Sequence, residues 1–312
     1  MKLFQKLTIA GIFLLGFSSQ ASAKAVTKRK CYIKKTSKTI KALEDNKYSI
    51  SIGDVTMTID ASYAAKIISY KIGNDEVLNQ DSFQNYSGST FWTSPQNDWG
   101  WPPVEEYDSK PFTAKIVGDK LVMNGQKSKF GYSISKEFNV NKKNNSIEVK
   151  YSINNESDET RQVAPWEISR VPNDGILFFQ ADKVEPGNDM TGLPFQFKHG
   201  AAWYEMDEDE DHRKINADGN GWIAYSAKGL LFVKTFQDLD PSETAPGEAE
   251  IQSYAFPGKT YVEVEEQGVY TTVKPGESVS WTVNWYLTHT DLEPVPSEDL
   301  LKEVKKLIKK LN

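Results

Sequence analysis

The chain has 312 residues, of which 38% are hydrophobic, 12% aromatic and 26% charged, which is the composition of a folded protein. Its formal net charge is −6, and loss of residues 1–23, which hold two lysines and no acidic residue, would make it −8. A chain this acidic is a poor partner for nucleic acid or for an anionic membrane surface, and we expect neither.

The first 23 residues have the pattern of a secretory signal peptide. Lys2 and Lys6 flank the start of a short apolar run, Leu7–Phe17, and the small residues Ala21-Ser-Ala23 form a cleavage site. We therefore expect cleavage after Ala23 and a periplasmic or secreted mature protein. The apolar run is too short for a bilayer span and no other segment is longer, so we expect no membrane insertion.

Residues 24–46 are predicted to form a basic, solvated leader, partly helical from Thr39 to Leu43. Cys31 is the single cysteine of the sequence, so an internal disulfide is excluded. We expect no cofactor, and the sequence leaves the oligomeric state open.

Residues 47–292 show many short segments of alternating apolar and polar residues, separated by Gly, Asn and Asp turns. This pattern predicts an all-β domain, a sandwich or a barrel. The segments with the clearest pattern are 48–52, 55–59, 66–72, 111–117, 120–123, 130–140, 147–153, 161–170, 176–180, 222–227 and 230–236.

A helix is expected over residues 297–311. Ser297 is a suitable N-cap, Glu298 and Asp299 follow in the first turn, and lysines gather toward the end. The apolar residues recur at helical spacing, which favours packing on the β domain over contact with a membrane. They are Leu300, Leu301, Val304, Leu307, Ile308 and Leu311.

The segment 261–268 predicts a strand with Tyr261, Glu263 and Glu265 on one face. Two carboxylates on one face of a strand can accept hydrogen bonds from sugar hydroxyls, and a carboxylate can also act as a general base. The alternative is a solvent-exposed acidic strand, since charged side chains are mostly exposed.

Tryptophans are candidates for stacking on a sugar ring. Trp99 and Trp101 lie in a Gly/Pro loop, which favours a ligand-facing role. Alternation places Trp166 with Ile168 and Arg170 on one strand face, with Glu167 on the other, and does not say which face lines a cleft. By the same parity, Trp281 and Trp285 are expected in the core.

The acidic residues 207–211, followed by Asn216-Ala-Asp-Gly-Asn220, raise the alternative of a calcium site. The spacing does not fit an EF-hand loop and the closing Glu is absent. We therefore interpret this segment as a solvated loop and expect no metal.

Several motifs resemble a known superfamily. The Glu265-Glu-Gln267 step, the Pro275-Gly-Glu277 turn and the strand ending Trp285-Tyr286 resemble the C-terminal signature of galactose mutarotase-like proteins. The chain from about Tyr48 to Leu287 looks still more like the exported bacterial proteins of the domain of unknown function 4380. The segments of this chain that resemble that group are Phe91–Pro95, Trp99–Pro102, Ala164–Arg170 and Glu263–Gly268. The resemblance implies a β-supersandwich with a sugar-binding face.

The resemblance also implies roles for single residues. It maps the base of the mutarotases onto Glu265, whereas the matching position of a family histidine, within 164–170, holds no His. His199 or Glu167 is then the candidate acid. The candidate sugar-binding residues are Trp92, Trp99, Trp101, Trp166, Arg170, Glu263 and Gln267.

Three functions follow as hypotheses. The leading one is an exported carbohydrate-binding protein of the galactose mutarotase-like type. The second is an active aldose 1-epimerase or another sugar-active enzyme with Glu265 as base. The third, from a different class, is a non-catalytic envelope interaction protein that binds no sugar.

Overall fold

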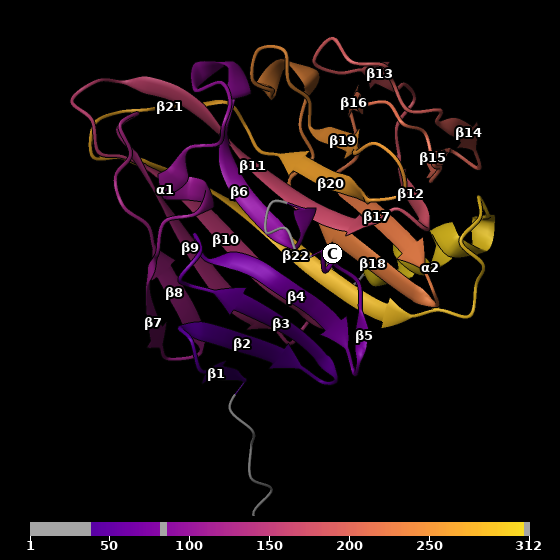
Figure 1. Ribbon diagram of the computed structural model, residues 1–312, viewed down its shortest axis with the longest axis horizontal. Coiled ribbons are helices and arrows are strands. Elements are labelled where there is room, and N and C mark those ends of the chain that lie inside the picture. Colours follow the sequence, from indigo (N-terminus) through magenta and orange to yellow (C-terminus); the bar gives the residue numbers. More distant parts are fainter. Residues whose placement is uncertain (1–38, 82–85, 309–312) are drawn as a thin grey trace, which may run out of the picture. The chain divides into compact units, whose positions relative to one another are not determined.

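The structure is a computed structural model that describes residues 39–81 and 86–308. The predicted signal peptide and most of the predicted basic leader lie outside these ranges. Within them, the chain forms two antiparallel sheets, one of twelve strands and one of ten (Figure 1). The predicted all-β class is therefore confirmed.

The larger sheet contains the strands β11 (Arg161–Pro172) and β20 (Tyr261–Gln267) and their neighbours, on which the candidate site lies. Its strands, in spatial order, are β1 (Ile40–Ala42), β2 (Lys47–Ile52), β3 (Val55–Asp60), β4 (Lys66–Ile72), β6 (Ser89–Ser94), β11, β20, β19 (Ile251–Ala255), β16 (Arg213–Ala217) and β13 (Glu185–Pro186). Strand β5 (Asp75–Glu76) pairs with β4, and β21 (Thr271–Val273) pairs with β11.

The smaller sheet has the order β14 (Gln196–Lys198), β15 (Ala201–Glu205), β12 (Ile176–Phe179), β17 (Trp222–Ala227), β18 (Leu230–Thr235), β22 (Ser278–His289), β10 (Ser146–Asn155), β9 (Tyr132–Asn141), β8 (Lys120–Asn124) and β7 (Thr113–Val117). The helices of the described residues are α1 (Glu105–Asp108), α2 (Glu298–Ile308) and the 3-10 turns η2 (Gln96–Asp98) and η3 (Pro241–Glu243).

Alternation explains the main core. Met57 and Ile59 on β3 are fully buried, as are Val149 on β10 and Val283 and Trp285 on β22, and along β3 and β10 the residues that flank them are only partly buried or exposed. Trp281 is 5% exposed, so the predicted core placement of both β22 tryptophans is confirmed. Burial of these apolar faces is the main stabilising term of such a fold.

The segment expected to be partly helical, Thr39 to Leu43, is instead an edge strand. Ile40–Ala42 pairs with β2, and Ile40 is 5% exposed. Only three residues lie between the end of β1 and Asn46 in the turn. Antiparallel pairing with β2 gives the backbone groups of this short segment hydrogen-bond partners, whereas a single helical turn is unfavourable to form.

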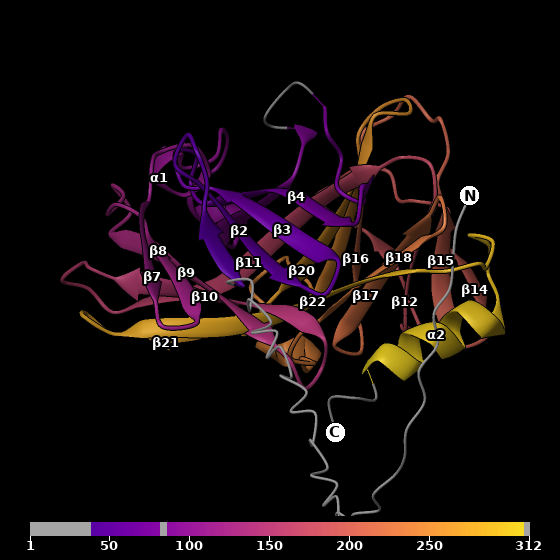
Figure 2. The same cartoon turned by 90° about the horizontal axis from the view of Figure 1, so that it is seen from below.

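Helix α2 covers the outer face of the ten-stranded sheet, and Figure 2 shows it below β12 and β15. Leu300, Leu301 and Val304 are buried against residues such as Phe178 and Trp203, which confirms the predicted packing on the β domain. The hydroxyl of Ser297 accepts a hydrogen bond from the Leu300 N–H at 3.3 Å, as an N-cap does. None of the described helices is long and apolar enough to cross a membrane.

A buried lysine holds the turn between β3 and β4. The Nζ of Lys136 on β9 donates to the carbonyl oxygens of Ala64 and Ala65, at 2.9 and 3.1 Å. Both alanines have positive φ, 50° and 48°, a conformation that non-glycine residues rarely adopt. The amino group of Lys136 therefore stabilises a strained turn from the protein interior, and burial lowers the pKa of Lys136 to about 7.

Candidate functional site

Strands β11 and β20 lie at the centre of the twelve-stranded sheet and set the faces of the site. Residue 166 pairs with 267, 168 with 265, and 170 with 263. Directly paired residues share a face, so Trp166 and Arg170 lie with Glu263 and Glu265. This face points away from the ten-stranded sheet and is polar and aromatic, whereas the opposite face enters the main core.

A cleft of about 520 Å³ lies over this face. Its wall includes Trp92 from β6, Trp166 and Arg170 from β11, Glu263 from β20 and Lys214 from β16. The loop after β6 adds Trp101 at the rim. Five of the predicted sugar-binding residues are thus brought to one cavity of a size typical for small ligands.

Glu265 lies directly beneath the cleft lining. Its side chain is fully buried, and its Oε2 accepts hydrogen bonds from Trp166 Nε1 at 2.9 Å and Lys214 Nζ at 3.2 Å. The Lys214 ammonium also lies 4.9 Å from the centre of the Trp166 ring. Glu265 therefore fixes a cation and an indole that both face the cleft. The alternative of a solvent-exposed acidic strand is wrong, because β20 is paired on both sides by β11 and β19.

Glu263 is the carboxylate of β20 that lines the cleft itself. It forms an ion pair with Arg170 at 2.9 Å, and its side chain is 12% exposed. Burial raises the pKa of Glu263 to about 7, with Glu265 adding to the shift and Arg170 opposing it. A carboxyl group with a pKa near neutrality is suited to both accepting and donating a proton.

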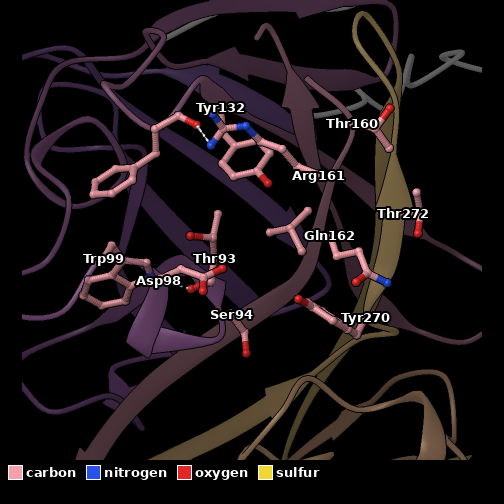
Figure 3. Close-up of a pocket in the computed structure, with 12 residues that line it drawn as sticks. Thr93, Ser94, Asp98, Trp99, Tyr132, Thr160, Arg161, Gln162, Tyr270 and Thr272 are labelled. Atoms are coloured by element: carbon pink, nitrogen blue, oxygen red, sulfur yellow. Dashed lines mark hydrogen bonds between the residues drawn. The ribbon is translucent and has the colours of Figure 1, made fainter. Parts of the chain in front are cut away.

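An aromatic wall stands on β6 and β11. Trp92 lies edge-on to Trp166, with ring centres 5.4 Å apart, and edge-on to Trp101 at 6.4 Å. Its Nε1 donates to Asp108 at 3.0 Å. Trp99 is different from the prediction, because it lines a separate cavity on the other side of the loop (Figure 3).

Gln267, the last predicted residue of β20, belongs to a row of buried hydrogen-bonded side chains beside the cleft. It accepts from the Ser94 hydroxyl at 2.6 Å and donates to Glu248 at 3.0 Å and to Gln252 at 3.1 Å. Glu248 also accepts from the backbone N–H of Gln96, a cleft residue. This network holds the loop after β6 against the sheet.

The structure does not bring the two candidate acids to the cleft. Glu167 lies on the opposite face of β11, fully buried with Ser89, Ser169 and Lys234. His199 lies in the turn before β15, in the other sheet, where its Nδ1 is 3.8 Å from a carboxylate oxygen of Glu298.

Residues that the sequence did not single out complete the cleft. Lys214, Tyr254 and His212 all line it, and the imidazole Nδ1 of His212 is hydrogen-bonded to the Tyr254 hydroxyl. The sequence gives no clear signal for them, because His212, Arg213 and Lys214 are three polar residues in a row and show no apolar alternation.

The acidic loop before β16 is used in ion pairing. Arg213 donates to both carboxylate oxygens of Asp207, with Nη1 3.1 Å from Oδ2. Among residues 39–81 and 86–308, no group of three or more His, Cys, Asp or Glu side chains is arranged to hold a metal ion.

Comparison with known proteins gives a consistent fold. No family model matches the chain, and no curated protein matches it. A protein named as a candidate aldose 1-epimerase from Escherichia coli K12 has a TM-score of 0.56 and 11% identity over 77% of this chain and 98% of that chain. A galactose mutarotase-like protein from Clostridium acetobutylicum has a TM-score of 0.52 and 13% identity, over 80% and 98%.

A galactose mutarotase-like protein from Lactobacillus casei ATCC 334 also has a TM-score of 0.52, with 10% identity over 77% of this chain and 99% of that chain. At sequence identities this low, the structural similarity indicates a shared fold and does not indicate a shared activity. With two large antiparallel sheets and these neighbours, the chain has the galactose mutarotase-like fold.

Proposed function

We propose that this protein binds a carbohydrate in the cleft over β11 and β20. The observation that carries the proposal is the floor of the cleft, where Glu265 holds Lys214 and Trp166 side by side. An ammonium group donates to sugar hydroxyls, and an indole face covers the C–H patches of a sugar ring. Glu263 and Arg170 supply an acceptor and a donor in the same space.

A glycan array and thermal shift against mono- and oligosaccharides test the proposal. A bound sugar at one hundred times its Kd stabilises the protein by about 2.7 kcal/mol and raises Tm by several degrees. Lys214→Met should abolish the shift, whereas Lys198→Met, an exposed lysine on β14, should leave it intact. If no sugar binds, the third hypothesis, an envelope interaction protein, becomes the better description.

A second candidate function is aldose 1-epimerase-like or other sugar-active chemistry. It is favoured by the presence of two carboxylates and a cation, Glu263, Glu265 and Lys214, at one cleft. Ring opening needs a base that takes the proton of the anomeric hydroxyl and a proton donor for the ring oxygen. Polarimetry of a freshly dissolved pure anomer separates the two candidates, since an epimerase accelerates the change in rotation and a binder does not.

Two further parts of the proposal come from the sequence. We propose export through the signal peptide ending at Ala23. The closer relation to the domain of unknown function 4380 group rests on its sequence motifs alone.

A further inference from the structure

Trp101 occupies an unusual position at the rim of the cleft. Its side chain is 71% exposed, whereas Trp92 and Trp166, in the same wall, are 6% and 2% exposed. Single exposed aromatic residues are ordinary on protein surfaces, so the exposure of Trp101 alone does not indicate a binding site. The position of Trp101 is more informative. Trp101 lines the cleft, while Trp99, two residues before it on the same loop, lines a second cavity, and Gly100 between them takes a φ of +71°.

The second cavity has a volume of about 720 Å³ (Figure 3). Its lining combines hydroxyl, amide, carboxylate and guanidinium groups with aromatic rings, from Asp98, Trp99, Arg161, Gln162, Tyr270 and Thr272. This is the same mixture of hydrogen-bonding groups and ring faces that the cleft offers, which is the chemistry a sugar needs.

Arg161 is held in place at the edge of this cavity. Figure 3 shows its guanidinium beside the Tyr132 ring, 5.8 Å from the ring centre, with Nη1 donating to the Phe130 carbonyl at 2.9 Å. Its Nε is buried and has no hydrogen-bond partner within the described part of the chain. Its Nη2 forms an ion pair with Glu159 at 3.1 Å, so the guanidinium is held in a fixed position at the edge of the cavity.

The two cavities share one wall, the segment from 92 to 101. Trp92 and Gln96 line the cleft, and Thr93 and Trp99 line the second cavity. The Trp92 ring lies within 5.7 Å of Trp99 and 6.4 Å of Trp101, measured between ring centres. The three tryptophans of this segment therefore form one aromatic cluster with members in both cavities.

We propose that the ligand is an oligosaccharide that extends from the cleft over Trp101 into the second cavity. This inference rests on the proposed function and adds the substrate class to it. One sugar ring occupies the cleft above Lys214, the next stacks on the exposed face of Trp101, and a further ring is bound by the groups around Arg161 and Tyr270. Affinity then increases with the number of sugar units.

The test starts from an array that carries mono- to hexasaccharides of several linkages. Each hit and its parent monosaccharide are then titrated by calorimetry. We expect affinity to increase over the first three units and then to level off. Because an aromatic contact contributes about 0.5–1.5 kcal/mol, Trp101→Ala should lower the ratio of oligosaccharide to monosaccharide affinity by about two- to tenfold.

Tyr270→Ala should lower the same ratio for trisaccharides and longer chains. The matched control is Phe197→Ala, which removes an aromatic side chain that is 52% exposed on β14, in the other sheet. That control should leave every affinity unchanged. Circular dichroism of each variant checks that the fold is retained.

The outcomes separate this inference from the proposed function. If monosaccharides bind as tightly as their oligomers, the extended site is wrong and the sugar-binding cleft stands. If affinity increases with length but both variants keep the wild-type ratio, the ligand follows another path and the inference is overturned. If no sugar of any length binds, both proposals fail together.

Discussion

Glu265 and Glu266 are neighbours in sequence that point to opposite faces of the same sheet. Glu265 reaches the cleft floor and contacts Lys214 at 3.2 Å, while Glu266 enters the main core and contacts Lys234 at 2.6 Å. Glu167 shares that buried lysine, and burial raises the pKa of Glu266 well above its ordinary value. One carboxylate thus serves the ligand side of the sheet, and the other belongs to a buried charge cluster.

Glu265→Gln and Glu263→Gln form the first test of the site. Glu263 lines the cleft, so Glu263→Gln should weaken sugar binding directly, by about 1–2 kcal/mol, as a charge-assisted hydrogen bond becomes neutral. Glu265→Gln should weaken binding by loosening Lys214 and Trp166. Calorimetry gives the affinities and polarimetry the turnover.

The same two variants identify the catalytic base if the protein is an epimerase. A loss of turnover that far exceeds the loss of affinity in Glu265→Gln, with a smaller one in Glu263→Gln, would assign the base to Glu265. Wild-type binding and turnover in Glu265→Gln would remove Glu265 from the site altogether.

A double-mutant cycle on Lys214 and Glu265 measures how strongly the cleft floor is coupled. Their side chains are 6% and 0% exposed, so Lys214→Met leaves an uncompensated buried carboxylate. We expect it to lower the free energy of unfolding by about 3–5 kcal/mol. The Lys214→Met/Glu265→Gln double variant should lose less than the sum of the single variants in urea titrations. Strictly additive losses would show that the pair is not coupled.

Lys136 predicts a pH dependence of stability. Burial lowers its pKa to about 7 from 10.5, so between these values the unfolded chain holds a proton that the folded chain has released. Raising the pH from 7 to 10 makes this proton uptake on unfolding less favourable, and stability should rise, by at most about 1.4 kcal/mol per pH unit for one proton. Lys66, whose pKa is also lowered to about 7, acts in the same direction.

Denaturant titrations across this pH range measure the slope. Lys136→Met should reduce it, and Lys150→Met, an exposed position on β10, should not. A wild-type stability that stays flat or falls between pH 7 and pH 10 would contradict the assignment.

Export is tested on the protein from its native host. N-terminal sequencing should begin at or near Lys24, after the Ala21-Ser-Ala23 site. A variant with Ala23→Arg should accumulate as the uncleaved precursor, because the site needs a small residue. Recovery of the full-length wild-type chain from the cytoplasm would count against a signal peptide.

The sequence predicts the core strands better than the strands of the cleft. Strands such as β3 and β10 bury one face only, so their apolar residues alternate and are easily recognised. Strand β6 is buried along its whole length and β16 almost so, because each has the core on one side and the cleft on the other. Polar residues occur on both faces of these strands, such as Ser89 and Thr90 in β6 and Arg213 and Lys214 in β16. They remove the apolar alternation, so the sequence predicts neither strand.

The candidate site, too, is predicted only in part from the sequence. Parity alone places Glu263 and Glu265 together on β20, and the structure agrees. Parity does not say which face of β11 meets the cleft, since that depends on the register with β20. The partners Lys214 and Tyr254 come from β16 and β19, and only the tertiary pairing places β19 beside β20 and β16 beside β19.

Strand β22 has a consequence for biosynthesis. It is the last strand of the described residues, yet it lies between β18 and β10 in the middle of the ten-stranded sheet. Until the ribosome has released residues 278–289, the two halves of that sheet have open edges and no common partner, which invites pairing with other chains. The ten-stranded sheet can therefore close only once β22 has been made, and a truncation before β22 would leave two halves with open, aggregation-prone edges.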